Sequence, residues 1–303
     1  MNSRNEESLA FGGQALIEGV MIRSRRHMVI CVRQPDDEIL THTEELIPLT
    51  ERHSFLGLPL VRGVVALFET MYVGVKGISF SANVALEEEE EEFTWKEWLL
   101  VAVMTLVMSS LFFVIPFLIT SFLKFTGVLF NVVESLVRLG VFLLYISVVS
   151  LWGEFRRVLQ YHGAEHKAIN SLEAGDALEV DSVREHSRLH RRCGTSFIFL
   201  VICVSIVLFS VMPKADFVTR LLYRLVLIPV IGSISYELLK LTSRHGDSVV
   251  AKMLTAPGLV FQRLTTREPD DAMIEVAIKA VDETVRLHRS ETQEEGVQKE
   301  KKD

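Results

Sequence analysis

Two histidines and a glutamate lie close together near the middle of this chain of 303 residues. Residues 161–167 read Tyr-His-Gly-Ala-Glu-His-Lys, a His-x-x-Glu-His pattern. On an α-helix, positions i, i+3 and i+4 share one face, so His162, Glu165 and His166 would point the same way. Two imidazoles and a carboxylate on one face suit a divalent metal ion. The pattern predicts metal ligands at His162 and His166, with Glu165 as the catalytic base or a further ligand.

A second histidine pair follows at the same spacing. His186 and His190 are four residues apart, and Cys193 comes three residues later. Two helical histidine pairs facing each other could supply a tetrahedral site, and three ligands plus water would give an open, catalytic one. We therefore add His186 and His190 to the predicted metal ligands. For Cys193 the favoured interpretation is a buried thiol at the start of an apolar run, with an accessory role at the site as the alternative.

The residue types also suggest which metal would bind and how it would act. Imidazole ligands suit zinc, iron, copper or nickel better than calcium or magnesium, and we expect a divalent ion, with zinc favoured. The spacing of His162, Glu165 and His166 is that of the inverzincin signature, in which the glutamate is the general base. A metal acidifies bound water, and a nearby carboxylate can take the proton. The alternative is that these histidines are ordinary polar residues of helix surfaces.

Long apolar runs place the chain among membrane proteins. Hydrophobic residues make up 49% of it, and the mean hydropathy is +0.29. Runs at 99–122, 125–152, 193–212 and 217–239 predict four transmembrane helices, with the lipid bilayer as partner. Trp95 and Trp98 lie before the first run, where interfacial aromatic residues are common.

Basic residues set the expected orientation. The segment 153–192 carries seven of them, whereas the two short connections carry only Lys124 and Lys214. Positive charge favours the cytoplasmic side, so we expect this histidine-rich loop and both chain termini in the cytoplasm of a multi-pass cell-membrane protein. The seven are Arg156, Arg157, Lys167, Arg184, Arg188, Arg191 and Arg192.

Three predicted features concern ionisable residues inside or beside the spans. Glu134 and Arg138 are four residues apart and lie either at the interface or paired within the bundle. Arg220 and Arg224 are expected to extend outward to the interface. Glu237 ends a stretch of small residues that would let another helix approach closely, and it is a possible accessory site residue.

The N-terminal third is expected to be cytoplasmic. Residues 1–55 contain β-branched runs at 11–23, 27–33 and 38–42, which predict a small antiparallel sheet. Glu18 is either an acid on the solvent face of an edge strand or a residue held close to the site. Residues 56–96 read as a long amphipathic helix, lying on the membrane or against the bundle, and a linker with six consecutive glutamates.

The C-terminal part is expected to be helical over 241–290. Pro257 and Gly258 would break it, a helix would run from 268 to about 289, and 291–303 would be a disordered tail. The net charge is -7 and no clustered basic face is visible, so nucleic acid is not an expected partner. Three cysteines are too few for a disulfide framework.

Several motifs together resemble the YqhQ-like family of bacterial membrane proteins. The resemblance covers residues 11 to 282, and it is carried by 12–23, 161–167, 193–197, 235–237 and 264–271. It implies a bacterial inner-membrane protein that belongs to a domain family of unknown function, described in general terms as a predicted metal-dependent enzyme. Relatives would be expected to have proline where this chain has Arg191, which makes the backbone there less constrained.

We therefore expect a mainly α-helical membrane protein with about four transmembrane helices. A small N-terminal β-plus-helix cytoplasmic region precedes the spans at 97–152 and 193–240, and a C-terminal helical extension follows. The expected function is a metal-dependent hydrolase at the cytoplasmic membrane face. The alternative is a non-enzymatic membrane scaffold, or a lipid- or ion-handling protein, with a structural or regulatory metal site.

Overall fold

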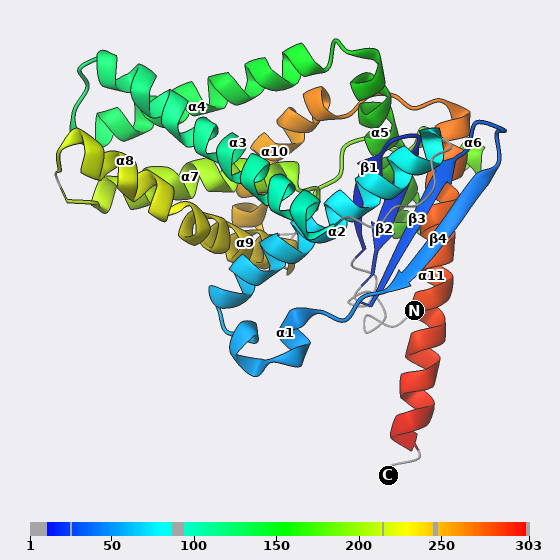
Figure 1. The fold of residues 1–303 in the computed structure, drawn as a ribbon. Helices are drawn as coiled ribbons and strands as arrows, with labels where there is room; N and C mark the ends of the chain where they lie inside the picture. The colour runs from blue at the N-terminus through cyan, green and yellow to red at the C-terminus, as the bar shows by residue number, and fades with distance from the viewer. Residues whose placement is uncertain (1–10, 25, 87–93, 214, 245–247, 301–303) are drawn as a thin grey trace.

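The chain forms a small sheet with its covering helices on one side and a bundle of apolar helices on the other (Figure 1). The computed structural model describes residues 11–24, 26–86, 94–213, 215–244 and 248–300. The acidic run 87–92 of the predicted linker and the last three residues of the predicted tail lie outside the described residues. The described part is mainly helical with one antiparallel sheet, as the sequence predicts.

The sheet has four strands in sequential order. They are β1 (Gly12–Leu16), β2 (Gly19–Arg23), β3 (His27–Arg33) and β4 (Ile39–Glu45), and each pairs antiparallel with the next. The first predicted run, 11–23, makes two strands, because a tight turn at Ile17 and Glu18 reverses the chain. Glu18 takes a positive φ of 50° there, which non-glycine residues rarely adopt.

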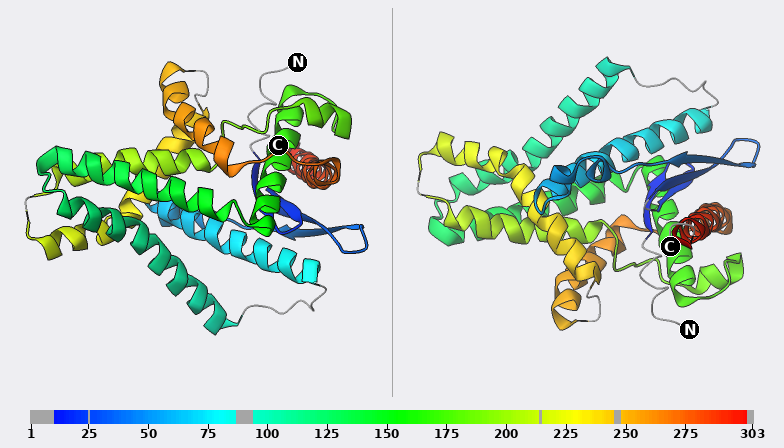
Figure 2. Two further views of the ribbon diagram at one scale, coloured as in Figure 1. Left: turned by 90° about the horizontal axis from the view of Figure 1, so that it is seen from above. Right: turned by 90° about the horizontal axis from the view of Figure 1, so that it is seen from below.

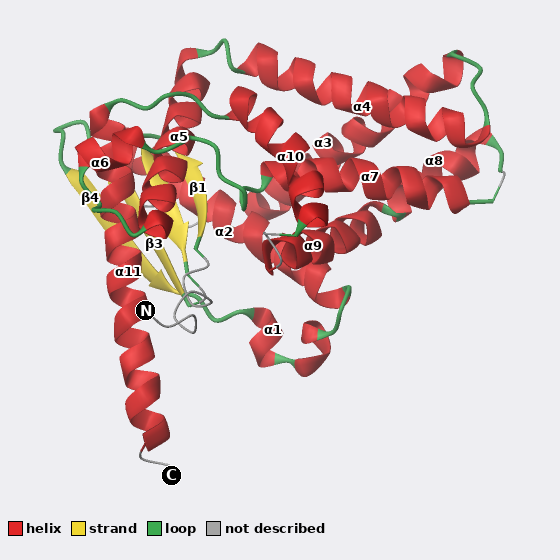
Figure 3. Cartoon of the chain, turned by 180° about the vertical axis from the view of Figure 1, so that it is seen from behind, coloured by secondary structure: helices red, strands yellow, loops and turns green. Residues whose placement is uncertain are grey.

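Both faces of the sheet are buried, because apolar residues alternate in direction along β2 and β3. On one face, Val20 and Val29 pack against α5 (Gly153–Ala174) and α11 (Asp271–Glu300). On the other face, Met21 and Ile30 form a cluster with Val73 of α2 (Val61–Leu86). Figure 3 shows α5, α6 and α11 covering the sheet from one side. The central strands thereby lie between helices on both faces, and one of these helices, α2, also packs against α9 of the bundle.

The bundle contains α3 (Trp95–Phe122), α4 (Gly127–Val149), α7 (Thr195–Val211), α8 (Phe217–Val226), α9 (Ile228–Arg244) and α10 (Val249–Thr265). Three described helices are long and apolar enough to cross a membrane: α2, α3 and α4. The pair α8 and α9 would be a fourth span, bent by 43°. Helix α7, in the predicted third span, has 17 residues.

The membrane-length helix α2 is more deeply integrated than a helix lying on a surface. Its Gly63 lies where an added Cβ would be 2.4 Å from Oγ of Ser233 on α9, so the two helices touch closely. Its C-terminal half packs on the sheet, where Gly74 meets Gln14 and the Ser81 hydroxyl accepts from the amide of Ile17. The small residues of α9 thus allow α2 to pack closely against it, and α2 connects the bundle to the sheet.

A buried ion cluster lies inside the bundle. Glu134 of α4 is fully buried and bonds Arg138 at 2.8 Å and Arg224 of α8 at 2.9 Å. The pairing of Glu134 with Arg138 is therefore the interior arrangement, not the interfacial one. The prediction that Arg224 extends outward is wrong: it is 4% exposed because Glu134 and the rings of Phe117 and Phe209 surround it.

The C-terminal region differs from prediction in two places. Pro257 lies within α10 without ending it. Helix α11 continues past Arg289 through Glu300, so the described part of the predicted disordered tail is helical. Two short turns, α1 (Leu49–Arg52) and η2 (Ser54–Gly57), connect β4 to α2, and α6 (Val180–Glu185) follows α5.

Candidate metal centre

Helix α5 carries the His-x-x-Glu-His pattern, as the sequence predicts. The helix ends at Ala174, and the following Gly175 closes the last turn with a φ of 79° and a hydrogen bond from its N–H to the carbonyl of Leu172. Such left-handed caps favour glycine. Glu165 and His166 on this helix are buried, and His162 is partly exposed at its edge. The three side chains therefore share a face directed into the protein at the junction of the sheet and the bundle.

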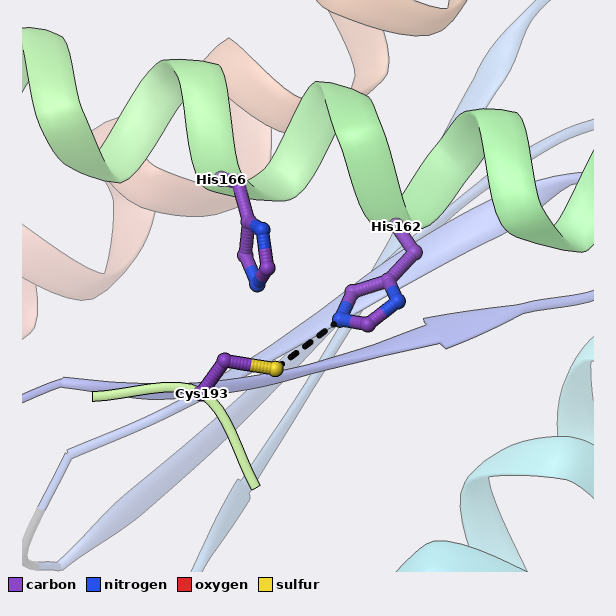
Figure 4. Close-up of side chains that lie close together, drawn as sticks. All are labelled: His162, His166 and Cys193. Atoms are coloured by element: carbon purple, nitrogen blue, oxygen red, sulfur yellow. Dashed lines mark hydrogen bonds between the residues drawn. The ribbon is translucent and has the colours of Figure 1, made fainter. Parts of the chain in front are cut away.

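Cys193 meets the two histidines of α5. Its Sγ lies 3.4 Å from Nε2 of His162, and the candidate ligand atoms of His162, His166 and Cys193 all lie within 4.8 Å of one another. Figure 4 shows the three side chains converging from α5 and from the loop before α7. In a tetrahedral zinc site, neighbouring nitrogen and sulfur ligands are about 3.5 Å apart. The separation of His162 and Cys193 matches that value.

Backbone carbonyls fix which nitrogen of each histidine faces the centre. Nδ1 of His162 lies 2.8 Å from the carbonyl oxygen of Thr265, and Nδ1 of His166 lies 2.7 Å from that of Arg188. A carbonyl only accepts hydrogen bonds, so both Nδ1 atoms must carry the proton. The lone pairs of Nε2 are then left for a metal, which is the usual arrangement of metal-bound histidine. Burial also lowers the pKa of His166, which favours the neutral imidazole that metals require.

Side chains of α5 hold the loop that delivers Cys193. Helix α6 ends at Glu185, and side chains of α5 bond to carbonyls at its end and in the irregular backbone that follows. Lys167 donates to the carbonyl of Arg184, and Asn170 donates to those of Ser187 and Leu189. From α10, Gln262 bonds both the amide and the carbonyl of His190. Cys193 is thus positioned by two helices that are distant in sequence.

The second histidine pair does not lie on a helix, so its two members do not share a face. His186 is the extended residue after α6 and its Nε2 lies 3.2 Å from Asp176. Nε2 of His190 lies 3.0 Å from Glu173, which also pairs with Arg192. The structure therefore brings His162 and His166 together with Cys193, and directs the polar contacts of His186 and His190 to carboxylates.

Neighbouring hydrogen bonds and charges set the pKa of Glu173. Burial opposes its ionisation, but the hydrogen bond and charge of His190 and the charge of Arg192 outweigh this and lower its pKa. An ionised Glu173 accepts from Nε2–H of His190. The ring of His190 lies 5.7 Å from that of His166, centroid to centroid. His190 therefore packs beside His166, held by the bonds of its backbone to Gln262 and of its ring to Glu173.

Glu165 is buried beside the ligands, and its Oε2 has no hydrogen-bond partner among the residues that the structure describes. This oxygen lies 3.9 Å from Nε2 of His162. Burial raises the pKa of Glu165, with an opposing effect from the charges of His162 and His190. Its other oxygen faces Gly13 of β1, where an added Cβ would approach to 2.2 Å. A buried carboxyl group with a free oxygen is suited to taking and giving a proton.

The remaining two candidate residues lie at the margins of the site. Glu18, in the β1–β2 turn, pairs with Arg157 and accepts a hydrogen bond from Tyr161, so it anchors the sheet to α5 one turn before His162. The hydrogen bond from Arg157 is the main cause of its lowered pKa. Glu237 pairs with Arg62 where α9 meets α2, outside the cluster of His162, His166 and Cys193.

The supporting contacts were not visible in the sequence. The carbonyls of Thr265 and Arg188 can come from any residue type, so no residue identity marks them. Gly13 is different, because a glycine in a strand can mark the close approach of another group. Gln262 carries a weaker signal, as a polar residue that follows the apolar run Leu259–Phe261. Only the fold brings these residues to α5.

Comparison with known proteins gives the family. Residues 58–287 match the model of a family described as a protein of unknown function, DUF1385. The chain is 35% identical over 307 residues to a protein of Bacillus subtilis strain 168 named "Uncharacterized protein YqhQ", covering 94% of this chain and 95% of that protein. No solved structure matches the chain. With most of its length matched at this level, the chain belongs to the DUF1385 family.

Proposed function

We propose that this protein is a metal-dependent hydrolase at the cytoplasmic face of a membrane. The observation that carries the proposal is the convergence of His162, His166 and Cys193, with the unpaired carboxylate oxygen of Glu165 beside them. Three protein ligands leave one position of a tetrahedral ion open, which distinguishes catalytic from structural zinc.

The residues fit a divalent transition metal. Both Nε2 atoms have free lone pairs, because each Nδ1–H is bonded to a carbonyl. The hydroxyl of Thr195 donates to Sγ of Cys193, which is the type of second contact that orients a metal ligand. Two imidazoles and one thiolate favour zinc over magnesium or calcium. The same donors could hold other late transition metals.

Glu165 is assigned the proton-transfer role. When bound, a divalent ion supplies Lewis-acid activation of water or of a substrate carbonyl. Because Oε2 of Glu165 lies beside the ligands and has no hydrogen-bond partner among the described residues, Glu165 can accept a proton from an attacking water and return it to a leaving group. The side chain of His162 is 19% exposed, so substrate would reach the centre from that side.

The membrane assignment supports the proposed location. Three helices are of membrane length, and α3 presents apolar side chains such as Leu100 and Leu106 with 60% and 65% of their surface exposed. Lipid would cover such a surface. We infer that α3, α4, α7 and the bent α8–α9 pair cross the membrane, and that the basic segment 153–192 places the metal centre in the cytoplasm.

A structural metal site is the second candidate. Oε2 of Glu165 is 3.9 Å from Nε2 of His162, near enough for Glu165 to be a fourth ligand after a small movement. Four protein ligands would close the coordination sphere and leave no place for substrate. The protein would then be a membrane scaffold, or a lipid- or ion-handling protein, whose metal fastens α5 to the loop before α7.

Metal content of the purified protein separates these functions from one without metal. We expect about one zinc ion per chain in the wild type, and a loss of about tenfold or more in affinity for His162→Ala, His166→Ala or Cys193→Ser. His186→Ala is the matched control, because His186 contacts Asp176 instead of the centre and should keep its metal. A metal content equal to that of the wild type in all four variants would refute the site.

Glu165→Gln separates the catalytic role from the ligand role. If Glu165 transfers protons, the amide should keep the metal affinity and abolish hydrolysis, because an amide cannot accept the proton of water. If Glu165 is the fourth ligand, the same change should weaken metal binding. A metal-loaded Glu165→Gln protein that hydrolyses a panel of esters and amides as well as the wild type does would contradict the proposal.

A further inference from the structure

Two cavities meet beside Arg23 at the end of β2, away from the metal centre. One has a volume of about 610 Å³ and lies between the β4–α1 connection, α2 and α3. The other has a volume of about 460 Å³ and lies between β2, α2 and α9. Arg23, Pro48 and Glu69 line both. The two cavities therefore form neighbouring compartments with one shared wall.

The larger compartment is apolar. Phe68 and Tyr72 of α2 form one side, and Trp98 and Ala102 of α3 form the other. Figure 2 shows the start of α3 standing away from α2. The rings of Tyr72 and Trp98 bridge this separation, with centroids 4.8 Å apart. Phe68 is 62% exposed and Tyr72 is 49% exposed, so this wall offers apolar surface that the described chain does not cover.

The smaller compartment is polar and carries excess positive charge. Arg23, Arg62 and Lys240 line it together with one acid, Glu69. Arg62 is neutralised by its ion pair with Glu237. Glu69 accepts a hydrogen bond from the amide of Leu49, at the far end of the connection. Three cations and two carboxylates therefore leave a net positive charge at this end.

Arg23 is the cation available to a ligand. Its guanidinium makes no hydrogen bond or ion pair with any residue that the structure describes, although it is only partly exposed. It stands on the boundary between the polar and the apolar compartment. A guanidinium presents several N–H donors in a planar fork that matches the oxygens of a phosphate. An anionic group at Arg23 would have apolar space directly next to it.

In the membrane arrangement proposed above, these compartments lie at the cytoplasmic end of α3. The apolar compartment is lined by the first turns of α3, and the most exposed apolar surface of α3 continues from there. The helix begins with a capping box between Thr94 and Glu97, a polar arrangement suited to the headgroup region. A lipid in the adjoining leaflet would therefore have its phosphate near the level of Arg23 and its chain beside α3.

We propose that the protein binds one anionic phospholipid here, with the phosphate at Arg23 and an acyl chain in the apolar compartment. The net charge of the polar compartment favours an anionic headgroup over a zwitterionic one. The compartment between α2 and α3 gives the chain a specific place, which a surface attraction alone would not. This inference is independent of the proposed hydrolase activity.

Trp98 reports directly on this site, because it lines the apolar compartment. A variant with Trp95→Phe and Trp152→Phe leaves Trp98 as the single tryptophan of the chain. It is reconstituted in phosphatidylcholine vesicles that contain a minor fraction of phosphatidylglycerol. Two vesicle preparations are compared. In one, the acyl chains of the phosphatidylglycerol carry the bromine quencher; in the other, an equal amount of the phosphatidylcholine carries it. We expect stronger quenching by the brominated phosphatidylglycerol.

Substitutions then locate the preference. Arg23→Gln should reduce the preference for phosphatidylglycerol by about tenfold, the usual effect of losing a charge-assisted hydrogen bond. Arg23→Lys should keep most of it, which shows that the Gln variant lost charge and not folding. Arg156→Gln is the matched control, because Arg156 is exposed at the start of α5 and lines neither compartment. Ala102→Phe should exclude the chain and reduce quenching by phosphatidylglycerol.

Two results would overturn the proposal. One is equal quenching of Trp98 by the two brominated lipids, which would show contact with bulk lipid only. The other is an unchanged preference in both Arg23→Gln and Ala102→Phe. If Arg156→Gln lowered the preference as much as Arg23→Gln, the attraction would be a general effect of surface charge, and the specific site would be refuted.

Discussion

At the scale of single residues, the position of Glu165 depends on a glycine. An added Cβ at Gly13 would lie 2.2 Å from Oε1 of Glu165, whereas at Gly12 it would meet nothing within 4 Å. Gly13→Ala must therefore displace the carboxyl group or push β1 away from α5, and we expect it to cost about 1–3 kcal/mol of stability. Thermal unfolding of the purified protein measures the difference.

Gly12→Ala is the control, because it makes the same chemical change one residue away on the same strand. We expect it to leave stability nearly unchanged. Removing the carboxyl group by Glu165→Ala should reduce the penalty of Gly13→Ala, since the clash partner is gone. If Gly12→Ala and Gly13→Ala were equally tolerated, β1 would not be what holds Glu165.

The sequence predicted one part of the candidate centre and not the rest for a physical reason. The pairing of His162 with His166 was predictable, because residues three and four apart lie on the same face of a helix. The same reasoning assigned His186 and His190 to one face, but α6 ends at Glu185, and the carbonyls of Ser187 and Leu189 after it bond to Asn170 of α5 instead of to a helical N–H. Cys193 meets His162 across 31 residues of chain, and no local periodicity encodes that contact.

At the scale of elements, Glu134 connects two helices of the bundle, α4 and α8. This one carboxylate serves two guanidiniums, Arg138 on its own helix and Arg224 on α8. Glu134→Gln would leave two buried cations without a counter-charge, and we expect a loss of about 3–5 kcal/mol. Arg224→Gln would leave a neutral pair of Glu134 and Arg138, so its cost should be smaller. Thermal unfolding in detergent gives the order.

Each substitution serves as the control for the other, because each removes one charge from the same cluster. If Arg224→Gln lowered the stability more than Glu134→Gln, a group other than Glu134 would have to neutralise the two arginines. The order of stability is therefore the measurement, and it does not depend on the absolute values.

Elements were predictable where the pattern was long and local. The apolar runs of α3 and α4 gave these helices to within a few residues of their observed bounds. The turn at Ile17 and Glu18 was missed, because neither residue is typical of turns; the pairing of Glu18 with Arg157 stabilises it from outside the sheet. Arg224 was placed outward because the sequence shows its neighbours along the chain and not Glu134, 90 residues away.

At the scale of the whole molecule, the candidate centre lies where the sheet unit joins the bundle. His162 and His166 come from α5, which packs on the sheet, and Cys193 directly precedes α7 of the bundle. The carbonyl of Thr265 adds the end of α10. A metal at this place would connect both parts of the molecule, so its removal should loosen the junction as well as the site.

The proposed arrangement in the membrane predicts a defined topology. Reporter domains fused after Lys124, between α3 and α4, should read as outside the cell, and those fused after Gly175, at the end of α5, should read as inside. A fusion in the connection between α7 and α8 should also read as outside. A cytoplasmic reading there would exclude α7 and the α8–α9 pair as spans and leave two crossing helices.

The most direct test of the central claim is X-ray absorption at the zinc edge of the metal-loaded protein. We expect one sulfur neighbour of the zinc at about 2.3 Å and nitrogen or oxygen neighbours at about 2.0 Å. The sulfur signal should disappear in Cys193→Ser and remain in Cys203→Ser, because Cys203 lies within α7, outside the cluster. A zinc spectrum without sulfur, or one whose sulfur survives Cys193→Ser, would contradict a centre built from His162, His166 and Cys193.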